Sequence, residues 1–65
     1  MKALLIKSCN RGEWYGNFIG KIVPYVRTVK NPIEYQSREF AGYTNFVQIH
    51  DAELIDVEDD FRGYY

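Results

Sequence analysis

The stretch TNFVQIHDAELIDV, residues 44–57, holds two runs of strand-forming residues on either side of a short polar segment. TNFVQI (44–49) and ELIDV (53–57) are rich in the β-branched and aromatic residues that favour strands. The segment between them, HDA (50–52), is short, and Asp51 is a residue type that caps helical turns. The stretch therefore predicts a strand, a single helical turn and a last strand.

Three earlier runs have the same strand-forming character and are bounded by turn signals. They are KALLIK (2–7), IGKIVPYVRTV (19–29) and IEYQSREF (33–40). Pro24 lies inside the second run, and because proline lacks the donor for a ladder hydrogen bond, we expect this strand at a sheet edge or bulged near Pro24. KNP (30–32) and AGY (41–43) supply turns. No window has the apolar spacing that indicates a long helix.

Five short strands whose edges need closing predict an all-β fold, a small five-stranded barrel. We expect the barrel to span residues 1–57, with a long first loop over 8–18. Residues 58–65, EDDFRGYY, then form an acidic and aromatic tail.

Two large aromatic residues are adjacent in the first loop, within NRGEWYGN (10–17). Neighbouring side chains of an extended backbone point to opposite faces. We therefore expect Trp14 to point inward as a core plug and Tyr15 to point outward as a contact. Gly12 and Gly16 would let the loop bend enough for this division.

The composition predicts one small globular domain in a reducing compartment. The chain has 65 residues, of which 46% are hydrophobic and 17% aromatic, which excludes an acidic disordered chain. A domain of about 60 residues buries only about 60% of its unfolded surface, so the core is small. One cysteine, Cys9, cannot form an internal disulfide. No apolar run is long enough for a membrane span or signal-peptide core, so we expect a soluble, cytoplasmic protein.

The charges separate along the chain although the net charge is only −1. Residues 1–40 carry seven basic and three acidic residues, whereas residues 41–65 carry one basic and six acidic residues. Opposite charges pair across strands, so mutual neutralisation within one compact domain is the first interpretation. The alternative is a separate acidic tail that engages a basic partner.

The order of these elements resembles the Src-homology-3-like (SH3-like) barrel, which has a long first loop and a one-turn helix before its last strand. More narrowly, the chain resembles short phage-encoded proteins of this fold over about residues 3–57. The matching pieces are WYGNFIGK (14–21), YV (25–26), GYTNFV (42–47) and DAELI (51–55). The resemblance implies the fold and a phage setting, and it transfers no functional residues.

The resemblance to the peptide-binding members of the fold is poorer. Their groove uses an acidic, aromatic first loop and a proline-tyrosine pair near the helical turn. Here the first loop has Arg11, Glu13, Trp14 and Tyr15, and the helical turn has His50. The groove that grips polyproline ligands is therefore only partly represented.

Catalytic and metal sites have little support in the sequence. Cys9 and His50 are a nucleophile and a base by type, but no local signature surrounds either one. The acidic residues from Asp51 to Asp60 lack the spacing and the glycine of a calcium loop. We therefore predict a protein that is not an enzyme and has no metal or cofactor.

Binding to another protein is the function that the sequence favours, because Trp, Tyr and Arg anchor interfaces most often. If the phage setting holds, the target is a host or defence protein in the host cytoplasm that this chain modulates or inhibits. The predicted partner-binding residues are Arg11, Glu13, Trp14, Tyr15, Tyr25, Tyr43 and His50. The predicted tail contacts are Phe61, Tyr64 and Tyr65.

Two alternatives remain at this stage. Single-stranded nucleic acid could bind to exposed rings and flanking cations, for which the candidates are Arg11, Trp14, Tyr15, Tyr25 and Arg27. The second alternative is a structural subunit of a larger assembly or a homodimer, in which the tail packs on a neighbouring chain.

Overall fold

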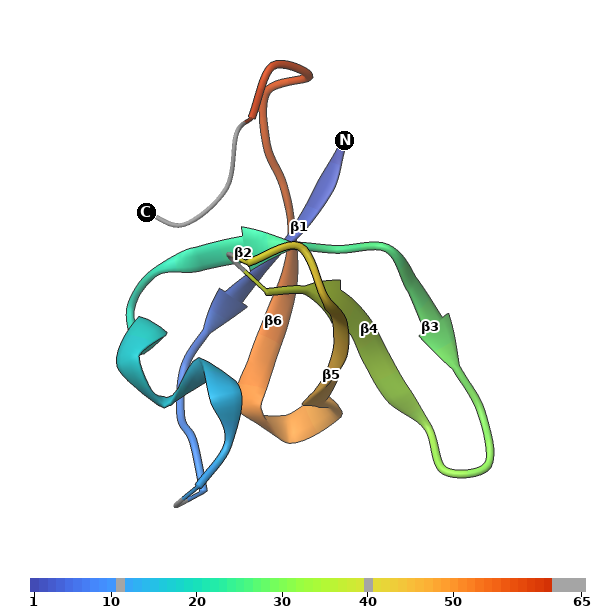
Figure 1. The fold of residues 1–65 in the computed structure, drawn as a ribbon. Helices are drawn as coiled ribbons and strands as arrows, with labels where there is room; N and C mark the ends of the chain where they lie inside the picture. Colours follow the sequence, from blue (N-terminus) through green and yellow to red (C-terminus); the bar gives the residue numbers. More distant parts are fainter. Residues whose placement is uncertain (11, 40, 62–65) are drawn as a thin grey trace.

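The fold of the described residues consists of short strands and two short 3₁₀ helices (Figure 1). The structure is a computed structural model that describes residues 1–10, 12–39 and 41–61. The six strands in this part of the chain are β1 (Lys2–Ile6), β2 (Ile22–Pro24), β3 (Arg27–Val29), β4 (Glu34–Arg38), β5 (Thr44–Gln48) and β6 (Ala52–Asp56). The two 3₁₀ helices are η1 (Trp14–Phe18) and η2 (Ile49–Asp51). The all-β prediction is confirmed.

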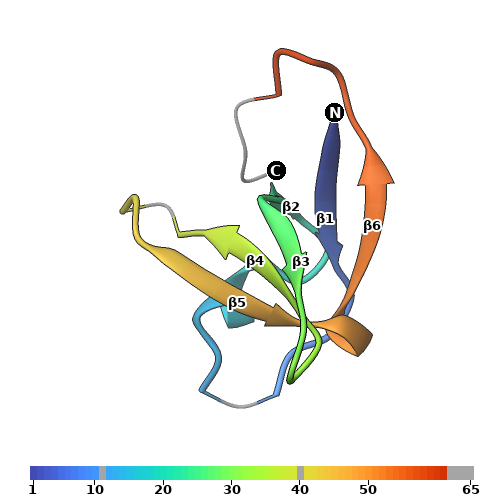
Figure 2. The same ribbon diagram turned by 90° about the vertical axis from the view of Figure 1, so that its right-hand side faces the viewer.

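The strands form two antiparallel, three-stranded sheets, in the orders β2-β1-β6 and β3-β4-β5 (Figure 2). Six strands in two open sheets replace the predicted closed barrel of five. The reason lies in the predicted strand 19–29, which divides after Pro24: β2 ends there in one sheet, and β3 begins at Arg27 in the other. As predicted, the proline lies on an edge strand, where its missing donor costs no ladder hydrogen bond.

The two sheets are joined at this break by hydrogen bonds to β4. The buried Ser37 hydroxyl donates to the Pro24 carbonyl at 2.6 Å, and the Val26 amide donates to the Gln36 carbonyl at 2.8 Å. The core lies between the sheets, where alternate strand residues meet. Its buried apolar residues are Leu4, Ile6, Tyr15, Val23, Val47 and Ala52.

The basic first strand and the acidic last strand neutralise each other. Lys2 Nζ lies 2.8 Å from an Asp56 oxygen, and Lys7 Nζ lies 3.4 Å from a Glu53 oxygen. The two strands are antiparallel neighbours, with Leu4 opposite Leu54. The interpretation of the charge separation as pairing between strands is therefore confirmed for this sheet. Such exposed pairs contribute only about 0–1 kcal/mol each.

The connections between the strands follow the turn signals closely. Asn31 has φ 62° in the turn after β3, and Gly42 has φ 98° in the turn after β4. In the second turn the Gly42 amide donates to the Glu39 carbonyl at 2.8 Å. The predicted helical turn 50–52 is η2, which begins and ends one residue earlier.

Candidate functional site

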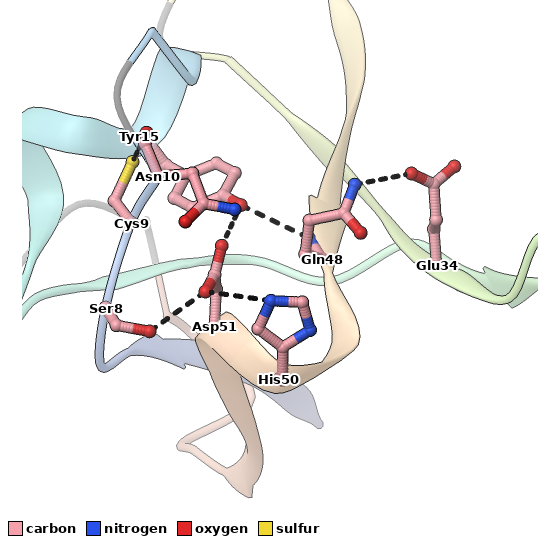
Figure 3. Close-up of polar contacts among 8 residues, drawn as sticks. All are labelled: Ser8, Cys9, Asn10, Tyr15, Glu34, Gln48, His50 and Asp51. Atoms are coloured by element: carbon pink, nitrogen blue, oxygen red, sulfur yellow. Dashed lines mark hydrogen bonds and ion pairs between the residues drawn. The ribbon is translucent and has the colours of Figure 1, made fainter.

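A polar network fastens the first loop to η2 (Figure 3). The Tyr15 hydroxyl donates to Asp51 Oδ2 at 2.5 Å, and the Ser8 hydroxyl donates to Asp51 Oδ1 at 2.9 Å. The Gln48 backbone amide donates to the Tyr15 hydroxyl oxygen at 3.3 Å. Tyr15 and Asp51 are both buried, so these hydrogen bonds satisfy polar groups that water cannot reach.

The prediction that Tyr15 points outward as a contact is wrong. It assumed extended backbone, whereas Trp14 and Tyr15 begin the 3₁₀ helix η1. At three residues per turn, successive side chains differ by about 120° rather than 180°. Tyr15 therefore enters the core, and Trp14 remains only partly buried beside it. Asp51 likewise does not cap η2: it is the last residue of that helix, Gln48 occupies the N-cap position, and the Asp51 carboxylate accepts hydrogen bonds from the first loop.

Burial and the Asp51 carboxylate shape the chemistry of this network. Burial, and then the hydrogen bond to Asp51, raise the pKa of Tyr15 well above its usual range, so its hydroxyl remains a donor. Loss of solvent, together with the charges of Asp51 and Glu13, raises the pKa of Cys9. The Cys9 thiol therefore stays protonated at neutral pH, and it donates to the Asn10 carbonyl at 2.9 Å.

The arrangement of Ser8, His50 and Asp51 differs from that of a nucleophile, base and orienting acid. In such a triad the imidazole lies between the nucleophile and the acid. Here Ser8 bonds directly to Asp51 Oδ1, and His50 Nε2 approaches the same oxygen at 3.6 Å from an exposed position. The network therefore holds the first loop and η2 together through the Asp51 carboxylate.

The aromatic surface, which we define as Trp14 and Phe18 of η1 together with Phe46 of β5, lies next to this network, where the first loop meets the edge of β5. The Trp14 indole Nε1–H donates to the Phe46 carbonyl at 2.8 Å. The Trp14 ring lies 5.6 Å from the Tyr15 ring, edge-on, and 6.3 Å from the Phe18 ring. Phe46 is 39% exposed, so this surface offers apolar area to solvent.

Sequence reasoning missed Phe18 and Phe46. The signal for Phe46 was present, because Val47 is a typical core residue and its strand neighbour must point the other way. Phe18 lies four residues after Trp14, and this spacing brings rings together only if the loop is helical. The assumption of extended backbone in this loop concealed that contact.

The remaining predicted residues Tyr25, Tyr43 and His50 lie outside η1 and β5, the elements that carry the aromatic surface. Tyr25 packs edge-on against Tyr35 at 6.0 Å, and its hydroxyl lies 2.9 Å from Thr28 Oγ1. Tyr43 is 71% exposed in the turn before β5, and His50 is exposed on η2.

The other predicted contacts lie in the first loop and the tail. Glu13 precedes η1, and its carbonyl accepts the Gly16 amide at 3.1 Å. Phe61 is half-buried, and its amide donates to the Glu58 carbonyl at 3.0 Å. The predicted contacts Arg11, Tyr64 and Tyr65 lie outside the described residues.

No three His, Cys, Asp or Glu side chains in the described part of the chain are grouped so that they could hold a metal ion. Neither described helix has the length and apolar character needed to span a bilayer. No protein-family model, curated protein or solved structure matches the chain.

Proposed function

We propose that this chain is a small non-enzymatic module that binds a protein partner through its aromatic surface. The observation that carries the proposal is the hydrogen bond from Trp14 to the Phe46 carbonyl, which fixes the indole on a strand edge while part of its ring faces solvent. Tryptophan is enriched among the residues that dominate binding energy. A ring already held in place loses little conformational freedom on binding, which favours affinity.

The proposal includes the SH3-like fold and the phage setting that the sequence resembles. In that fold β2 and β3 would together correspond to one bent strand shared by both sheets. The hydrogen bonds of Pro24 and Val26 to β4 support this correspondence, because they keep the chain against β4 through the break. The partner would then be a host or defence protein that the chain modulates or inhibits.

The test is affinity capture from a bacterial lysate, followed by mass spectrometry, with wild type and two matched variants. Phe46→Thr removes the exposed ring, keeps a strand-forming residue and keeps the carbonyl that Trp14 binds. Ile33→Thr is the control, because it removes a 58% exposed apolar side chain from the turn before β4. We expect wild type and Ile33→Thr to capture the same partner and Phe46→Thr to lose it. Capture of the same partner by Phe46→Thr, or of none by wild type, contradicts the proposal.

Single-stranded nucleic acid is the second candidate, favoured by one row of side chains on the sheet β3-β4-β5. Arg27 lies opposite Gln36, and Gln36 lies opposite Phe46, so all three share one face. Arg27 Nε donates to Gln36 Oε1 at 2.7 Å, which holds the guanidinium along this row. A ring for base stacking and a cation for phosphate are the parts that such binding uses.

This candidate predicts that an oligothymidylate changes the fluorescence of Trp14 at low salt, and that the change fades as salt rises. Arg27→Gln should weaken the signal, whereas Lys21→Gln, outside the row, should not. The absence of a salt-sensitive signal eliminates this candidate.

A further inference from the structure

The strands on either side of η2 are both at the edge of a sheet, and the first loop covers only one of them. On β5, the Phe46 carbonyl receives the Trp14 indole, and the Gln48 amide donates to the Tyr15 hydroxyl. β6 is the last strand of its sheet and pairs with β1 alone. Figure 2 shows β6 at the outer border of this sheet, with β1 between it and β2.

The register identifies which peptide groups of β6 face away from β1. The Val57 amide donates to the Met1 carbonyl at 2.8 Å, and the Lys7 amide donates at 2.8 Å to the carbonyl just before β6. Because antiparallel strands alternate between bonded and non-bonded pairs, Glu53 and Ile55 also bond to β1. The outward-facing residues of β6 are Ala52, Leu54 and Asp56. Among the described residues, no backbone hydrogen bond from another element reaches these three.

Carboxylates surround this free edge and continue beyond its end. They belong to Glu53, Asp56, Glu58, Asp59 and Asp60. Three of them are paired: Glu53 with Lys7 at 3.4 Å, Asp56 with Lys2 at 2.8 Å, and Asp59 with the terminal amine at 3.1 Å. Within the described part of the chain, Glu58 and Asp60 form no ion pair. Residues 56–60 also line an open recess past the end of the strand. Negative charge therefore exceeds positive charge along the edge.

We infer that the free edge of β6 docks an extended, lysine- or arginine-rich segment of a partner protein, which adds to the sheet as a further strand. Strand addition uses main-chain hydrogen bonds for affinity, and here the outward peptide groups of Leu54 and Asp56 would supply them. A second copy of this chain would oppose carboxylates with carboxylates, which destabilises a strand pair. Nucleic acid would meet the same repulsion through its phosphates. This surface is separate from the aromatic surface, so either proposal can fail without the other.

Solvent-exchange NMR on the full chain tests the inference with a synthetic peptide of sequence KTVKVTVK and blocked ends. Two control peptides separate charge from strand pairing: ETVEVTVE reverses the charge, and KTPKPTPK keeps the charge but lacks donors at its prolines. At a free concentration about ten times Kd, exchange of the Leu54 and Asp56 amides should slow about tenfold. The amides of Glu53 and Ile55 already bond to β1 and should not change.

Two variants complete the test. The double variant Glu58→Gln and Asp60→Asn should weaken peptide binding about fivefold at low salt, because it removes two unpaired surface charges. Phe46→Thr should bind the peptide as wild type does. Equal binding of KTPKPTPK, unchanged exchange at Leu54 and Asp56, or no binding of KTVKVTVK each overturns the inference. The last result would mean that the carboxylates only protect an edge strand from pairing.

Discussion

Replacing Tyr15 with phenylalanine should destabilise this protein more than the same replacement at Tyr43. The Tyr15 hydroxyl is the donor to Asp51 Oδ2 and the acceptor for the Gln48 amide. Tyr15→Phe keeps the ring in the core but leaves a buried carboxylate oxygen without this donor. Nothing else in the core needs to move, so the change isolates the hydroxyl.

The expected loss in the free energy of unfolding is about 2 kcal/mol, the usual size for a hydrogen bond to a charged group in a buried site. A 65-residue domain has a total of only about 3–10 kcal/mol. The melting temperature should therefore fall by about 8–16 °C. Urea unfolding is a suitable assay, because Trp14 lies 5.6 Å from the Tyr15 ring and reports on this region by fluorescence.

Tyr43→Phe is the matched control, because it removes the same hydroxyl from a side chain that is 71% exposed. It should change stability by less than about 0.5 kcal/mol. The pKa of Tyr15 is raised on folding, so its contribution is fully present below the ordinary phenol pKa of about 10 and is lost as pH rises further. Stability of Tyr15→Phe should therefore depend less on pH above 10. If Tyr15→Phe is as stable as Tyr43→Phe, the network does not hold the first loop.

Three further predictions concern separate regions. The hydrogen bond and the charge of Lys2 lower the pKa of Asp56, so Lys2→Gln should raise that pKa toward the ordinary value of an aspartate in an NMR titration. The small associated stability is present above the ordinary pKa and is lost as pH falls through the lowered one, and an unchanged pKa refutes the pairing. Gly42→Ala should lower the free energy of unfolding in urea by on the order of 1 kcal/mol, because Gly42 has φ 98°, a conformation that alanine adopts only with strain. An unchanged free energy of unfolding contradicts the left-handed turn. Cys9 should react with iodoacetamide more slowly than free cysteine at neutral pH and accelerate only at higher pH, since its pKa is raised; fast alkylation at neutral pH would show a thiolate instead.

The strands were predictable from the sequence because local composition encodes them. Runs of β-branched and aromatic residues place β1, β4, β5 and β6 within a residue or two of their observed bounds. Pro24 also indicates an edge correctly, because the missing donor is a local property of the residue. The division of the 19–29 run between two sheets was not predictable in this way, since it depends on which strands lie beside each half.

The buried network was beyond sequence reasoning for a different reason. Tyr15 and Asp51 are 36 residues apart, and neither residue type is typical of a core. A lone acidic residue beside His50 in a turn is normally solvated, and only the folded first loop shows that Asp51 accepts two hydroxyl donors. Tyr15 was assigned to the surface because neighbouring side chains alternate between two faces in extended backbone. That alternation fails here because the local backbone is helical.

The adjacency of Trp14 and Tyr15 follows from the geometry of the β5 edge. Phe46 and Gln48 are two residues apart on this strand, so their peptide groups face the same side. Two adjacent aromatic residues on η1 bind both groups. The Trp14 indole N–H donates to the Phe46 carbonyl, and the Tyr15 hydroxyl oxygen accepts the Gln48 amide. The pair thus occupies successive edge positions where another strand would otherwise pair. Because β6 has no such cover among the described residues, the proposed strand addition is assigned to β6, whereas the proposed partner of β5 would contact the rings of η1 rather than the backbone of the strand.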